Sequence, residues 1–129
     1  SDVEIIKSFE GIYDPLLSDA QNSLKTIQLG KSYYVKMKTP SAIIVNGVPV
    51  NGNIQLNLKA GWNLIGCPFQ DAINIETALE TIWPYFESIK TLTTFNNNGV
   101  ANEFNSCKQL VPGYGYLLKV SSDCVLIFP

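Results

Sequence analysis

The strongest structural signal in the chain is the sequence Gly113-Tyr114-Gly115-Tyr116-Leu117-Leu118-Lys119-Val120. It is aromatic and aliphatic and is entered through glycine, which is typical of a β-strand that follows a turn. A similar pattern stands 83 positions earlier, in Gly30-Lys31-Ser32-Tyr33-Tyr34-Val35-Lys36-Met37. Both sequences are therefore predicted to be strands, and their likeness predicts an internal duplication.

The alignment at a constant shift of 83 residues extends beyond this pair without a gap. Identities are few, but apolar and turn residues keep matching positions, which is typical of a diverged repeat. The further matches are residues 6–8 with 89–91, 23–27 with 106–110, and 42–45 with 125–128. The chain is therefore predicted to be a single module, residues 1–129, made of an incomplete repeat 1 (1–47) and a repeat 2 (53–129).

The front part of repeat 2, about residues 53–83, has no counterpart in repeat 1. Two explanations stay open: the chain was cut inside an array of repeats, or the folding unit is offset from the sequence unit. Terminal repeats of an array are commonly atypical, so the asymmetry does not contradict the duplication.

Most of the remaining sequence also predicts strands. Alternation is strict in residues 53–58, where Ile54, Leu56 and Leu58 share one face. The other predicted strands are residues 3–9, 42–45, 62–65, 89–95 and 124–128. The fold class is therefore predicted to be mainly β, either an antiparallel sandwich or two similar β lobes.

One short helix is predicted near residues 74–83. Its apolar residues recur at helical spacing, and either Asn74 or Asp71 can cap its first turn. Pro84 is expected to end this helix or to force a new turn.

Composition excludes several functional classes. Apolar residues make up 46% and charged residues 16% of the 129 residues, so a packed core is expected. The net charge of -2 and the lack of a basic stripe predict no nucleic-acid partner. No apolar run is long enough to predict a membrane span.

The candidate chemistry is sparse. The chain has no histidine, which removes the usual general base and the usual zinc ligand. Its eleven acidic residues are scattered, and no glycine-rich phosphate loop precedes a helix. Asp14 and Asp19 share one loop, but two carboxylates make a thin calcium site. No enzyme activity, catalytic residue, metal or cofactor is therefore predicted.

The three cysteines predict one disulfide. Cys107 and Cys124 both belong to repeat 2, and their aligned positions in repeat 1 hold Leu24 and Ser41. Joint replacement of both partners is what a disulfide between Cys107 and Cys124 predicts. The alternative is two separately buried thiols, and Cys67 is expected to be structural.

Aromatic residues are the only positive sign of ligand binding in the sequence. Flat aromatic faces stack well on sugars and peptides at low entropic cost. The candidate ligand-binding residues are Tyr13, Tyr34, Tyr85 and Tyr114. Tyr33 and Tyr116 are common to both repeats and are expected in the core, and ordinary burial stays the alternative for any single aromatic residue.

Two short motifs resemble a known repeat. Gly61-Trp62-Asn63 opens a predicted strand, and Gly113-Tyr114-Gly115-Tyr116 opens another. Together they resemble the GWN…GxGY tandem repeats of large secreted and surface proteins of bacteria, some of which degrade polysaccharides. Repeat 1 lacks the GWN segment and has Ser32 in place of the second glycine.

The resemblance implies a non-catalytic accessory module, located outside the cell or on its surface. The function expected from it is polysaccharide binding or adhesion, with a plant or microbial polysaccharide as the possible ligand. The alternative is a structural spacer or a protein-docking domain that contacts neighbouring domains of a larger protein.

Overall fold

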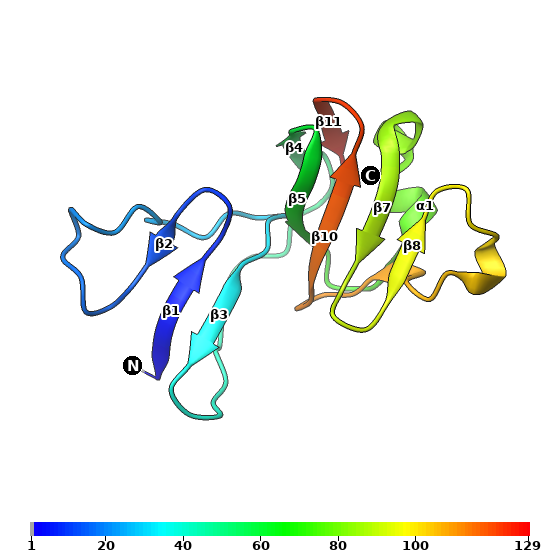
Figure 1. Ribbon diagram of the computed structural model, residues 1–129. Coiled ribbons are helices and arrows are strands. Elements are labelled where there is room, and N and C mark those ends of the chain that lie inside the picture. The colour runs from blue at the N-terminus through cyan, green and yellow to red at the C-terminus, as the bar shows by residue number, and fades with distance from the viewer. Residues whose placement is uncertain (1) are drawn as a thin grey trace.

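The fold consists of two groups of antiparallel strands that lie side by side (Figure 1). The structure is a computed structural model, and it describes residues 2–129. The prediction of a mainly β, antiparallel fold is confirmed. The elements in chain order are β1 (Val3–Lys7), β2 (Ile12–Tyr13), β3 (Tyr34–Met37), β4 (Gln55–Leu58), β5 (Gly61–Gly66), β6 (Ile73–Asn74), α1 (Ile75–Ala78), η1 (Glu80–Tyr85), β7 (Phe86–Lys90), β8 (Phe95–Asn97), η2 (Asn102–Phe104), β9 (Gln109–Leu110), β10 (Gly115–Val120) and β11 (Cys124–Ile127).

The buried core lies in the C-terminal unit, residues 53–129. Its main sheet has the order β5-β10-β7-β8, so β10 is paired along both edges. Alternation turns Tyr116, Leu118 and Val120 of β10 toward the core, where all three are buried. The same core cluster contains Ile75 and Leu79 from the helical segment, and residues of β4 and β11. Hydrophobic burial on this face of β10 therefore joins the sheet, the helix and the β4–β11 pair.

The helical segment lies where it was predicted, but only its first turn is α-helical. The Asn74 side chain caps α1 by accepting a hydrogen bond from the Glu76 amide at 2.8 Å. After α1 the chain tightens into the 3₁₀ helix η1, which contains Pro84. Pro84 therefore lies inside a new, tighter helical turn and does not end the helical segment.

One predicted strand, residues 89–95, is a hairpin instead. β7 ends at Lys90 and β8 begins at Phe95, and the Thr91 amide donates to the Thr94 carbonyl between them. Thr91 and Thr94 also share a side-chain hydrogen bond of 2.8 Å. These threonines close a turn, although their β propensity suggested a continuous strand.

The N-terminal unit, residues 2–47, repeats the pairing of the C-terminal unit at the same shift of 83. Its sheet has the order β2-β1-β3. Ile6 pairs with Val35 as Ile89 pairs with Leu118, and the irregularity near Val3 recurs near Val120. Turn contacts recur too, since the amides of Gln28 and Val111 each donate to a tyrosine hydroxyl five residues further on.

The two units differ sharply in burial. Every buried hydrophobic side chain among residues 2–129 lies between Leu56 and Phe128. Val35 is 42% exposed, whereas its counterpart Leu118 is fully buried. Residues 42–45, predicted as a strand, form an exposed segment outside any strand. Their counterparts in β11 pair with β4, and the N-terminal unit holds no equivalent of β4 within residues 2–47.

A matched pair of truncations tests this asymmetry. Leu118→Ala removes a fully buried side chain, so we expect a loss of about 2–5 kcal/mol in the free energy of unfolding. Val35→Ala, at the equivalent but exposed position, should cost about 1 kcal/mol or less. Urea denaturation of both variants measures the difference, and equal losses would contradict the described packing.

Candidate functional site

Two hollows are candidates for a functional site. The larger is a groove of about 750 Å³ on the C-terminal unit, lined by the β7–β8 turn, residues 106–109 and the segment that enters β10. The smaller is a pocket of about 250 Å³ between the two units, lined on one side by residues 8–10 and Lys31. We call them the terminal groove and the inter-unit pocket.

Tyr114 and Leu92 stand on the rim of the terminal groove. Tyr114 is 64% exposed, and Leu92 at the tip of the β7–β8 turn is fully exposed. Tyr116 lines the groove from within, and its hydroxyl accepts a hydrogen bond of 2.8 Å from the Val111 amide. Burial raises the pKa of this phenol, so it stays protonated. The groove therefore offers an apolar lining with an exposed ring, in addition to threonine hydroxyls.

The structure does not bring the four predicted tyrosines together. Tyr13 pairs with Ile6, and Tyr34 pairs with Lys7, so the two rings lie on opposite faces of their sheet. Tyr85 precedes β7 near the end of β10, whereas Tyr114 precedes its start, about 17 Å away at the usual strand rise. Of the four predicted tyrosines, only Tyr114 lines the terminal groove.

The predicted disulfide between Cys107 and Cys124 is not formed, because all three cysteines are free thiols. Cys107 lies in the terminal groove beside Tyr116, near the start of β10. Cys124 follows the opposite end of β10 and pairs with Leu58. Tyr116, beside Cys107, lies four residues before Val120 at the other end of β10, which is about 13 Å along the strand. Bridged cysteines, by contrast, have Cα atoms within about 7 Å of each other. Cys107 and Cys124 therefore occupy two separate packing sites, and their alignment with Leu24 and Ser41 is not the mark of a disulfide.

Burial also sets the chemistry of these thiols. Desolvation raises the pKa of Cys107, and a hydrogen bond with Thr94 offsets part of that rise. Desolvation, with a smaller contribution from Asp123, raises the pKa of Cys124. Because the thiolate is the reactive form, neither cysteine is activated as a nucleophile.

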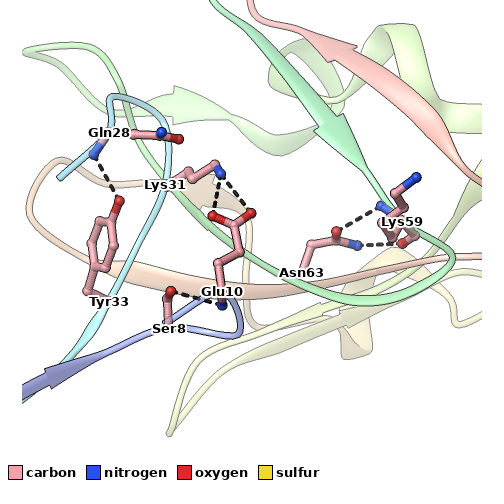
Figure 2. Close-up of polar contacts among 7 residues, drawn as sticks. All are labelled: Ser8, Glu10, Gln28, Lys31, Tyr33, Lys59 and Asn63. Carbon is pink, nitrogen blue, oxygen red and sulfur yellow. Dashed lines mark hydrogen bonds and ion pairs between the residues drawn. The ribbon is translucent and has the colours of Figure 1, made fainter. Parts of the chain in front are cut away.

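The inter-unit pocket is framed by local polar contacts (Figure 2). Lys31 makes an ion pair with Glu10 at 2.7 Å, and both residues line the pocket together with residues of β4, β5 and the turn between them. In that turn, the Asn63 side chain accepts from the Lys59 amide and donates to the Lys59 carbonyl, at 3.0 and 2.8 Å. The side-chain amide of Asn63 in the GWN motif therefore stabilises the β4–β5 turn and is already engaged in hydrogen bonds.

Two glycines allow the units to approach. The Gly66 amide donates to the Gly30 carbonyl at 2.9 Å, and a Cβ on Gly66 would lie 3.0 Å from the Lys31 carbonyl oxygen. A Cβ on Gly115 would lie 3.0 Å from the Cβ of Ser32. The contact of these two glycines with the other unit was not predicted from the sequence. No sequence signal could reveal it, because the contact joins segments distant in the chain.

The terminal groove and one side of the inter-unit pocket are equivalent surfaces. At the constant shift of 83 residues, Phe9 and Lys31 correspond to Leu92 and Tyr114. In the N-terminal unit this surface faces β4 and β5 of the other unit. In the C-terminal unit the same surface is open and forms the terminal groove.

Residues 2–129 contain no group of three histidine, cysteine or acidic side chains arranged to hold a metal ion. Asp14 instead accepts a hydrogen bond from the Leu16 amide at 2.8 Å within its own loop. None of the helices within residues 2–129 has the length and apolar character needed to cross a bilayer.

Comparison of the chain with protein-family models, with curated proteins and with solved structures finds no match. The functional assignment therefore depends on the two hollows and on the correspondence between the units.

Thiol labelling tests the corrected cysteine assignment. The unfolded, unreduced chain should react with three equivalents of a thiol reagent, because no disulfide is present. In the folded chain Cys107 should react most slowly, since it is the only fully buried cysteine. Mass spectrometry of digested protein assigns the sites, and a single reactive thiol in the unfolded chain would restore the disulfide.

Proposed function

We propose that the chain is a non-catalytic module of a larger extracellular protein, built from a duplicated unit whose copies dock against one another in a row. The duplication is supported by the matching strand pairs of β1–β3 and β7–β10. Equivalent turn contacts add support, such as the serine hydroxyls that accept from the amides of Ile12 and Phe95. The extracellular location rests on the resemblance of the GWN and GxGY motifs.

One observation carries the docking role. The surface through which the N-terminal unit contacts β4 and β5 recurs on the C-terminal unit, where it is uncovered. Leu92, which corresponds to Phe9 of the inter-unit pocket, is fully exposed there. A further unit with a β4–β5 hairpin fits this surface by the contacts that already join the two units.

The titratable groups of the terminal groove support a binding role over a catalytic one. The groove lining contains no aspartate or glutamate, and Lys108 donates at 2.6 Å to the Asn102 carbonyl. The Cys107 thiol is held protonated by burial. None of these groups is placed as a general base near the exposed Tyr114 ring.

An extended chain tests the docking role. A second copy of residues 47–129 is joined after Pro129, so that each residue of the copy lies 83 positions after the original residue that it repeats. We expect amide hydrogen exchange in Thr91, Thr94 and Tyr114 of the original unit to slow by at least about tenfold, because the added β4–β5 hairpin covers them.

The matched control carries Gly66→Ala in the added copy alone. The new methyl group would meet the Tyr114 carbonyl of the preceding unit, as a Cβ on Gly66 would meet that of Lys31. Exchange should then stay as fast as in the original chain. Equal exchange in the extended chain and in this control would refute docking.

A second candidate function is polysaccharide binding in the terminal groove. It is favoured by the exposed ring of Tyr114 beside the hydroxyl groups of Thr91, Thr93 and Ser106. These groups combine a stacking surface with hydrogen-bond partners for sugar hydroxyls.

Affinity electrophoresis against a panel of soluble plant polysaccharides separates the two candidates. If a polysaccharide binds, one member of the panel should retard the chain, and Tyr114→Ala should abolish the retardation. Tyr85→Ala is the matched control, because Tyr85 is 41% exposed but lies at the other end of β10. If no polysaccharide of the panel retards the chain, docking is the one candidate function that remains.

A further inference from the structure

The N-terminal unit has an open strand edge where the C-terminal unit has a paired one. β10 pairs with β7 on one side and with β5 on the other. Its counterpart β3 pairs only with β1, so β3 ends the β2-β1-β3 sheet (Figure 1). An uncovered edge presents unpaired backbone groups that can accept another strand.

The apolar positions beside this edge are uncovered as well. Ile6 and Val35 correspond to Ile89 and Leu118, which are fully buried, yet Ile6 is half-buried and Val35 is exposed. The same contrast recurs elsewhere in the unit. The exposed members are Ile27, Ile43 and Val45, and their buried counterparts are Leu110, Leu126 and Phe128. The N-terminal unit therefore carries the apolar half of a core without the elements that cover it.

The C-terminal unit identifies the elements that cover such a surface. β5 pairs with β10, and β4 pairs with β11. Ile75, Leu79 and Ile82 of α1 and η1 complete the same core cluster. The covering elements β4, β5, α1 and η1 lie within residues 53–83, apart from the last two residues of η1.

We propose that the open edge of β3 and its apolar face bind a strand–turn–strand–helix segment with the sequence pattern of residues 53–83. This segment adds its second strand antiparallel to β3 and lays its helix over Ile6 and Val35. The register follows from the C-terminal unit, where Ile65 lies opposite Tyr116 and Leu64 opposite Leu117. The incoming residues equivalent to Ile65 and Leu64 therefore lie opposite Tyr33 and Tyr34.

This interaction surface is distinct from the terminal groove. It rests on the correspondence of β3 with β10, and it does not require that the groove dock a further unit. Its readouts come from β3, so failure here and failure of the docking role are separately visible.

The decisive experiment uses the full chain with an added copy of residues 48–83 joined directly before Ser1. The last residue of the copy, equivalent to Trp83, then precedes the residue that aligns with Pro84. We expect amide exchange in β3 to slow by at least about tenfold relative to the original chain. The control carries Ile65→Asp in the added copy, which places a charge opposite Tyr33 and should restore fast exchange. Equal exchange in the two extended chains would overturn the proposal.

A disulfide cross-link tests which residues of the added strand lie opposite which residues of β3. It does so even if the added copy stabilises the chain only slightly. In an extended chain whose native cysteines are replaced by serine, Leu64→Cys in the copy is combined with Tyr34→Cys. Directly opposite residues have Cβ atoms about 4.5–5.5 Å apart, so mild oxidation should form this disulfide. Lys36→Cys replaces Tyr34→Cys in the control, because residue 36 lies on the same face but two positions out of register. A higher yield at Tyr34 supports the proposed register, and equal or absent yields would overturn it.

Discussion

Covering the apolar face of β10 is the physical constraint on which the rest of the structure depends. Tyr116, Leu118 and Val120 point to that face, and each buries a large apolar surface. A sheet with one such face is stable only when another layer packs against it. In the C-terminal unit the capped helical segment and the β4–β11 pair supply that layer. The position of each of these elements follows from the need to reach this face.

The N-terminal unit shows what the same strand pairing does without a covering layer. Its hydrogen-bonded registers match those of the C-terminal unit, so local pairing and turn chemistry are sufficient to define the sheet. Its apolar side chains nevertheless stay exposed or half-buried. The unit meets the other one through the bridge between Lys31 and Ile65 of β5 and through the hydrogen bond from the Gly66 amide to the Gly30 carbonyl. This contact is the pattern for the proposed docking of further units.

Two different constraints, a positive φ or a close contact with the other unit, explain the glycines of β5 and β10. Gly61 has a φ of 95°, which favours glycine and lets the β4–β5 turn close under the Asn63 side chain. Gly66 and Gly115 have no such torsional requirement. They are small because the backbone or side chain of the N-terminal unit lies 3.0 Å from where a Cβ would stand. Ser32 takes the place of Gly115 in the N-terminal unit, whose equivalent contact surface is absent from residues 2–47.

The sequence by itself determined several of the strands and turns, because alternation, glycine placement and helix capping act over a few residues. Asn53–Leu58 alternation, the cap at Asn74 and the strands entered at Gly30 and Gly113 were all recognisable from neighbouring residues alone. Only the tertiary structure decided which apolar residues are buried, since burial depends on whether a covering element exists. For that reason residues 42–45 form no strand. The tertiary structure also decided that Cys107 and Cys124 lie far apart and that, of the four predicted tyrosines, only Tyr114 lines a groove.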